Sequence, residues 1–312
     1  MQTPPEHGAA ILCVSLASST ASNTDASAQN RHRDALSSHN IQKVLRRLPL
    51  ITTIIVGCVI TLSLVQSRYT ANAGTPEQWR QLAPGFESRL SVLIAPSTSL
   101  PVPFHAIRLD PTRYTLRVLD SRIYGERALS AVALAERTNA LAAINANFFL
   151  EDFSPLGLIL TDGELKNPVR KVDWGVFAVS RSGNARIEHT RNWQHRNDDE
   201  FAIQAGPRLI VDGKTLTLKP NLARRSALCI DTKNRVLLVA TSGLLLLDEF
   251  AILLQKPQEN GGFDCYQALN LDGGSSTQLH VAIPDANIGV ASDSPIPIAV
   301  GVFARSIKEP SK

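Results

Sequence analysis

The sequence predicts an α+β fold: a large mixed or antiparallel β-sheet core with a few flanking helices, preceded by one N-terminal apolar segment. Short apolar runs separated by turn residues fill the chain from about residue 88, and few segments have a helical pattern. The chain has 312 residues, of which 44% are hydrophobic and 5% aromatic, and its net charge is +4. This composition excludes wholesale disorder, collagen-like repeats and a multispanning membrane protein.

The N-terminal part divides into a polar tail and an apolar segment. Residues 1–42 are rich in Ser, Ala, Asn and Gln, so we expect them to be disordered. Residues 48–65 carry no charge and follow basic residues at 43, 46 and 47. As a helix, such a run spans about 27 Å, close to the thickness of a lipid core. The charge bias predicts a cytoplasmic N-terminus and an exported C-terminal domain, periplasmic or extracellular.

Two interpretations of this segment stay open. One is a single-pass transmembrane anchor over residues 43–67. The other is a signal peptide cleaved after Ala73, where Ala71-Asn72-Ala73 has the small residues that a signal peptidase accepts. A buried helix of the folded domain is disfavoured, because the run has no polar face.

The rest of the chain is expected to form one exported domain. We expect a linker over 68–87, the domain over 88–305 and a disordered tail over 306–312. No basic helix with interleaved aromatic residues is present, so nucleic acid is not an expected partner. Cys229 and Cys265 fall within the domain and can form a disulfide or remain as buried free thiols.

The expected elements follow the apolar runs. We expect strands over 90–95, 104–109, 114–119, 156–160, 176–179, 208–211, 226–230, 236–240, 277–281 and 298–303. Helices are expected over 126–138, which is rich in Ala and Leu, and over 247–256, where apolar residues recur at helical spacing before Pro257.

Known catalytic motifs are missing from the sequence. It contains no G-x-S-x-G, G-x-G-x-x-G, P-loop or H-E-x-x-H pattern and no paired C-x-x-C, which removes the usual support for serine hydrolases, dinucleotide enzymes, NTPases and common zinc enzymes. His105, His189, His195 and His280 have no metal-ligand spacing, so we interpret them as surface or strand residues.

The strongest local feature is an apolar strand that runs into Asp272, Gly273, Gly274, Ser275 and Ser276. It delivers a carboxylate at a strand end, beside a turn whose backbone N–H groups can bind an anion such as phosphate. An ordinary Asp-Gly turn is the equally weighted alternative.

Two further polar clusters interrupt apolar runs. Asn145 and Asn147 fall on one side of an extended segment, where their amides can bind sugar hydroxyls or hold a carboxylate, although a strand ending in an Asx turn has the same pattern. Arg225 opens a strand and can clamp a phosphate, although an exposed arginine at a strand end is commoner.

These clusters, in this order, resemble the phosphodiester glycosidase family. The resemblance rests on INANFF, SPLGL with a following Asp-Gly hairpin, QAGPRLIVDG, RRSALCID and ALNLDGGSS, and it covers residues 88–304. Asn145, Phe148 and Phe149 match the family's Asn-Gly-Gly-Phe-Phe-like segment, Arg225 its Arg-Thr-Ala strand, and Asp272 to Ser276 its glycine-serine loop. Ala146, Asn147 and Ser226 depart from the family pattern, which makes the chain more similar to the bacterial branch.

The resemblance implies hydrolysis of a sugar-1-phosphate diester at the anomeric carbon. Asp272 is the expected nucleophile or general base, and Glu151, Asp152 and Glu249 are reserve catalytic carboxylates. Arg225 and the backbone of 273–276 are expected to bind phosphate, and Asn145 and Asn147 to orient the sugar.

A carboxylate and a cationic phosphate clamp can suffice for this scheme, and a divalent cation that bridges Asp272 and the phosphate is the alternative that stays open. The competing hypothesis is a membrane-tethered module that binds envelope glycans or sugar phosphates on the same fold without turnover.

Overall fold

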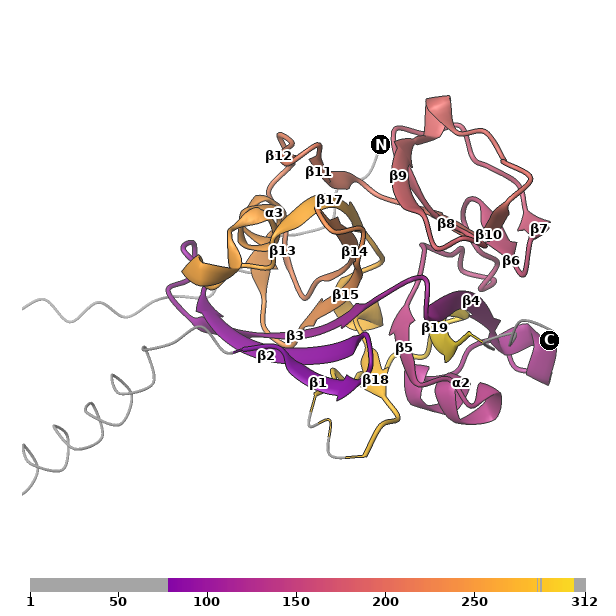
Figure 1. The fold of residues 1–312 in the computed structure, drawn as a ribbon, viewed down its shortest axis with the longest axis horizontal. Helices are drawn as coiled ribbons and strands as arrows, with labels where there is room; N and C mark the ends of the chain where they lie inside the picture. The colour runs from indigo at the N-terminus through magenta and orange to yellow at the C-terminus, as the bar shows by residue number, and fades with distance from the viewer. Residues whose placement is uncertain (1–77, 285, 287, 306–312) are drawn as a thin grey trace, which may run out of the picture. The chain divides into compact units, whose positions relative to one another are not determined.

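The computed structural model describes residues 78–284, 286 and 288–305, which all belong to one compact unit, Gly74–Lys312 (Figure 1). The predicted tail over 1–42, the apolar segment over 43–67, the cleavage site at Ala73 and the tail over 306–312 lie outside these residues. Within the described part of the chain, no helix is long and apolar enough to cross a membrane.

The largest sheet has eight strands in the order β1-β2-β3-β15-β14-β17-β11-β12. Their bounds are β1 Arg80–Ala83, β2 Phe86–Ile94, β3 Pro101–Leu109, β11 Arg208–Val211, β12 Lys214–Thr215, β14 Ser226–Asp231, β15 Val236–Thr241 and β17 Cys265–Asn270. Figure 1 shows β1, β2 and β3 in indigo and purple at one edge. The sheet extends into the range expected to be a linker, because β1 pairs with β2 from Arg80 onward.

Three smaller sheets complete the fold. A five-stranded sheet has the order β7-β6-β10-β8-β9, a four-stranded sheet the order β18-β5-β19-β4, and β13 pairs with β16. Their bounds are β4 Tyr114–Asp120, β5 Ala142–Asn145, β6 Ile159–Thr161, β7 Glu164–Asn167, β8 Gly175–Ser180, β9 Ala185–His189, β10 Asp199–Ala205, β13 Leu222–Ala223, β16 Leu245–Leu246, β18 Leu279–Val281 and β19 Ile298–Ala304.

Two α-helices, α2 Ala131–Thr138 and α3 Leu247–Gln255, accompany these sheets in the described residues. Short 3₁₀ turns are η1 Ser121–Tyr124, η2 Thr190–Asn192, η3 Gln258–Asn260 and η4 Gly274–Ser276. The named strand pairs are all antiparallel. The β-rich α+β prediction is therefore confirmed in its antiparallel form.

The predicted helix over 126–138 is wrong at its start. The helix begins at Ala131, because Ser130 has extended backbone and its side chain accepts a hydrogen bond from the Ala133 N–H as an N-cap. Leu129 instead forms a β-bridge with Ile296. The second helix ends before Pro257, as predicted.

The central strands are buried on both faces, which explains their continuous apolar runs. In β14 and β15, Leu228 and Leu238 join a core shared with the five-stranded and four-stranded sheets. Cys229 and Leu237 pack on the other side, in the cluster that contains α3. Cys229 and Cys265 are buried free thiols, so the free-thiol alternative holds in this structure.

Candidate active site

A cavity of about 770 Å³, called the main cavity below, forms where the three polar clusters of the sequence meet. Phe148 follows β5, Arg225 precedes β14, and Gly273 and Gly274 follow β17, and all four residues line it. The register of the large sheet accounts for part of this convergence, because Ala227 of β14 lies opposite Asn270 of β17.

Asn145 joins the clusters together. Its Nδ2 donates to the backbone oxygen of Asp272 at 2.6 Å, and its Oδ1 accepts from the Ser226 hydroxyl at 2.6 Å and from the Gln278 N–H at 3.1 Å. The side chain is 1% exposed. Asn145 therefore has no accessible group for a sugar, and its role is to hold the Asp272 loop against β14.

Asp272 is a partly exposed carboxyl at the head of this loop. Burial raises its pKa, while hydrogen bonds from the Ser276 hydroxyl and the Gly273 N–H act in the opposite direction. The Gly273 N–H lies 2.9 Å from Oδ1. A carboxyl whose charged form is penalised by burial is suited to accept a proton during catalysis.

The backbone of the glycine-serine loop is largely closed on itself. The Gly273 N–H is used by Asp272, the Gly274 N–H donates to the Arg224 oxygen at 2.9 Å, and the Ser276 N–H donates to the Gly273 oxygen at 3.1 Å. The guanidinium of Arg224 also donates to the Gly274 and Ser275 oxygens. Most of the N–H groups expected to bind phosphate are thus already occupied, either within the loop or by the backbone oxygen of Arg224.

Arg225 brings a positive charge to the cavity wall. It is 6% exposed, its Nε donates to the Leu245 oxygen and its Nη2 donates to the oxygen of Asn221. Burial lowers the pKa of the guanidinium, and the nearby charge of Asp248 opposes that shift. Nη1 makes no hydrogen bond to the residues that the structure describes, so it remains available for an anion in the cavity.

Buried amides supply further polar groups near the cavity. Asn270 lines it, and its Nδ2 donates to the Gly206 and Leu271 oxygens while Oδ1 has no partner within the described residues. Asn147 is similar: Nδ2 donates to the Leu156 oxygen and Oδ1 is unpaired among those residues. Since buried acceptors normally have a hydrogen-bond partner, both oxygens are candidates to accept a hydrogen bond from a ligand or a water molecule.

A cis Gly206-Pro207 bond forms another part of the wall, next to Trp174. A Cβ at position 206 would lie 2.7 Å from the Trp174 ring, so only glycine allows this close approach. Trp174 in turn packs against Phe148, with ring centroids 4.9 Å apart.

The reserve carboxylates lie elsewhere. Glu249 accepts from the Ser97 N–H and hydroxyl and from the Leu246 N–H, so it ties α3 to the loop before β3. Asp152 accepts from the N–H and hydroxyl of Ser154 in an exposed turn, which lowers its pKa, and Glu151 is exposed beside it. None of the three lines the main cavity.

Asp173 and His189 form a polar pair beside the cavity that no sequence motif pointed to. Asp173 lines the main cavity, and His189 Nε2 lies 2.7 Å from its Oδ1. Because His189 Nδ1 accepts the Arg191 N–H, a neutral imidazole carries its proton on Nε2 and donates it to Asp173. This hydrogen bond lowers the pKa of Asp173. Sixteen positions separate the two residues, and no motif marks either of them.

Over residues 78–284, 286 and 288–305, no group of three or more His, Cys, Asp or Glu side chains is arranged to hold a metal ion.

Comparisons with known proteins identify the family to which this chain is similar. The family described as phosphodiester glycosidase matches residues 138–303, which contain all three clusters. No curated protein matches the chain.

Among the solved structures with a similar fold are the following two. The catalytic domain of zebrafish N-acetylglucosamine-1-phosphodiester alpha-N-acetylglucosaminidase, auto-inhibited by its pro-peptide, is 16% identical with a TM-score of 0.58, over 74% of this chain and 87% of that one. A hypothetical protein from Synechocystis is 18% identical with a TM-score of 0.57, over 74% of this chain. The match spans 64% of the length of the Synechocystis chain.

Proposed function

Because this chain belongs to the phosphodiester glycosidase family, we propose that it hydrolyses a sugar-1-phosphate diester at the anomeric carbon. The observation that carries the proposal is that Arg225 and Asn270 line one cavity of about 770 Å³ together with Gly273 and Gly274, the two residues that directly follow Asp272. A carboxyl whose pKa is raised by burial, a buried cation and an unpaired amide oxygen match the three parts of such a substrate: the reacting carbon, the phosphate and the sugar hydroxyls.

In the proposed reaction, the bond between C1 and the phosphate oxygen breaks, and the oxygen leaves with the electron pair as a phosphate monoester. A water oxygen forms the new bond to C1. Asp272 takes the proton of that water as general base, or attacks C1 first as the nucleophile. A phosphate monoester is a good leaving group, so the step needs less acid catalysis than ordinary glycoside hydrolysis.

Arg225 is proposed to bind the phosphate through Nη1. Its other guanidinium nitrogens are fixed by the Leu245 and Asn221 oxygens, so the free nitrogen is held in place before substrate binds. A pre-positioned cation in a cavity stabilises the charge that develops on the leaving phosphate.

Asn145 and Asn270 are proposed to have different roles in the site. Asn145 positions Asp272 through its backbone. Asn270 Oδ1 is proposed to accept a hydrogen bond from a sugar hydroxyl.

We also propose that residues 48–65 export the domain, because basic residues precede this uncharged run. Protease treatment of intact cells tests this part, since an exported domain is digested and a cytoplasmic one is protected.

The experiment for the activity compares wild-type protein with Asp272→Asn on methyl diesters of glucose, mannose and N-acetylglucosamine 1-phosphate. Wild-type protein should hydrolyse at least one of them, and the variant should lose about 1,000-fold in kcat while it retains binding. If neither form hydrolyses any diester and both bind one, the chain is a binding module and the enzyme proposal is wrong.

A further inference from the structure

A second hollow of about 590 Å³, called the outer hollow below, adjoins the main cavity. Lys171, Asp173, Arg191 and Trp193 are among the residues that line it. Asp173 also lines the main cavity, so the two spaces share one wall residue. The two spaces therefore lie next to each other at Asp173, whose side chain is exposed.

The loop over 168–174 forms this shared wall, and the buried side chain of Gln204 holds it. Gln204 Oε1 accepts from the Arg170 N–H at 2.8 Å, and its Nε2 donates to the Arg170 oxygen at 2.7 Å. The same amide accepts from the Leu158 N–H and contacts the Thr190 hydroxyl. Every hydrogen-bonding position of Gln204 is used, so the wall is fixed in place before a ligand binds.

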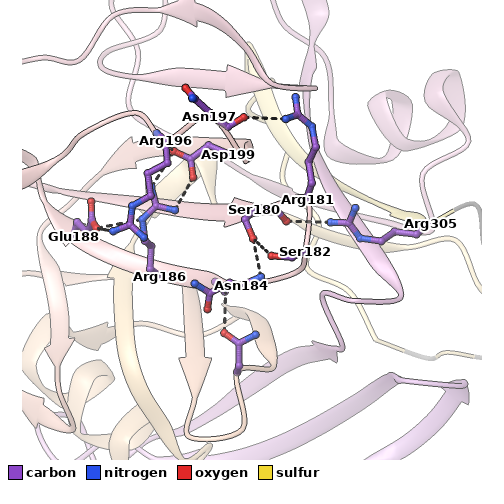
Figure 2. Close-up of polar contacts among 12 residues, drawn as sticks. Ser180, Arg181, Ser182, Asn184, Arg186, Glu188, Arg196, Asn197, Asp199 and Arg305 are labelled. Atoms are coloured by element: carbon purple, nitrogen blue, oxygen red, sulfur yellow. Dashed lines mark hydrogen bonds and ion pairs between the residues drawn. The ribbon is translucent and has the colours of Figure 1, made fainter.

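Trp193 provides an aromatic surface in the outer hollow, and a charged network supports it from one side. The Arg186 guanidinium lies 5.1 Å from the ring centroid. Figure 2 shows that Arg186 is bonded to Asp199 and Glu188, with Arg196 also reaching Glu188. Because both oxygens of Asp199 are paired with Arg186, the cation under the ring cannot swing away easily.

The charges of the outer hollow favour an anion. Lys171 and Arg191 are exposed and make no salt bridge within the described residues. Asp173, the one carboxylate of the lining, already accepts a hydrogen bond from His189. The positive charges of Arg191 and Arg208 also stabilise its charged form. A second anion can therefore gain from both cations without displacing an existing ion pair.

We propose that the outer hollow is a leaving-group subsite, which selects diesters whose leaving group carries a ring and a second phosphate. The ring would pack on Trp193, which offers apolar area with little loss of side-chain entropy, and the phosphate would lie between Lys171 and Arg191. This inference rests on the proposed function for the identity of the scissile bond. Two sources share the chemistry: a polymer of sugars joined by phosphodiesters, and a nucleoside diphosphate sugar.

The test measures kcat/KM for three substrates of the same sugar: the methyl diester, a two-unit sugar-phosphate oligomer with a terminal phosphate, and the uridine diphosphate sugar. Full-length wild-type protein is compared with Trp193→Ala and with Lys171→Ala/Arg191→Ala. Each variant should lose about tenfold on at least one extended substrate and stay within about twofold on the methyl diester. The extended substrate that shows the loss identifies the source.

Matched controls are Tyr266→Ala and Lys214→Ala, an aromatic and a basic residue that line neither space. They should leave all three substrates unchanged. Equal losses on the methyl diester and the extended substrates would overturn the subsite, because the side chains would then act on the fold or on the main cavity. No loss on either extended substrate would overturn it as well.

A binding arm separates this inference from the proposed function. Calorimetry with Asp272→Asn protein should give a Kd for an extended ligand about tenfold lower than for the methyl diester, and Trp193→Ala should remove the difference. If wild-type protein hydrolyses nothing but this difference is found, the proposed function fails and the outer hollow stands as a binding subsite for the ring and the second phosphate. Equal affinities, or no binding of any ligand, would overturn the subsite.

Discussion

Asn145 and Gln204 are two buried amides that hold two different walls of the site. Asn145 fixes the loop that carries Asp272, and Gln204 fixes the loop that carries Lys171 and Asp173. The first loop uses most of its backbone N–H groups in hydrogen bonds to protein acceptors and partly buries its carboxyl, whereas the second leaves charged side chains exposed. The difference indicates a division of work, since catalysis needs a shifted pKa and recognition needs free charges.

Asn145→Ala and Gln204→Ala test this division with the largest expected effects. Both should be destabilised by at least about 2 kcal/mol, because each leaves several buried polar groups unpaired. Asn145→Ala should also lose about 100-fold in kcat on the methyl diester, since Asp272 is no longer held in place. Gln204→Ala should stay within about threefold on that substrate. Chemical denaturation and steady-state kinetics measure the two effects, and equal losses of kcat would show that the walls do not act separately.

Arg225→Lys tests the proposed phosphate contact on the side of the site that carries Asp272. A lysine keeps the charge but loses the fixed guanidinium geometry, so KM for the methyl diester should rise about tenfold with little change in kcat. Arg117→Lys is the control, because Arg117 makes an exposed salt bridge with Asp162 outside the cavity. An unchanged KM would remove Arg225 from the phosphate site.

Asp272→Asn separates the catalytic role from a structural one by its pH dependence. A raised pKa means that the fold favours the protonated acid, so the wild-type carboxyl stabilises most below its unfolded pKa of about 3.9. That contribution is lost as the pH rises through the folded pKa. The free energy of unfolding of wild-type protein, relative to the variant, should therefore fall as the pH rises above about 4. A relative gain with rising pH would contradict the buried-carboxyl account.

Glu249→Gln should give the smallest effect. It weakens the contacts with Ser97 and with the first turn of α3, so we expect a loss of about 1 kcal/mol in stability. Its kcat should stay within twofold of wild type, as should those of Glu151→Gln and Asp152→Asn. A loss of kcat without a loss of folding stability would show that the substituted carboxylate takes part in the reaction.

The sequence predicts Asp272 and Arg225 better than the residues of the 168–174 loop, for a physical reason. Asp272 and Arg225 lie at the ends of apolar strands, where a polar side chain interrupts a clear pattern. Asp173 lies in an irregular loop, and its contact with His189 depends on how β8 and β9 pair. Gln204 occupies a strand that the pattern does not reveal, so its bonds to the 168–174 loop become visible only in three dimensions.

Hydrolysis in water enriched in ¹⁸O tests the central proposal most directly. Cleavage at the anomeric carbon places the label on the C1 hydroxyl of the released sugar, because the water oxygen bonds to carbon. Mass spectrometry of the products from wild-type protein should find ¹⁸O in the sugar and none in the phosphate monoester. Label in the phosphate would show that the P–O bond breaks, which would contradict the glycosidase mechanism.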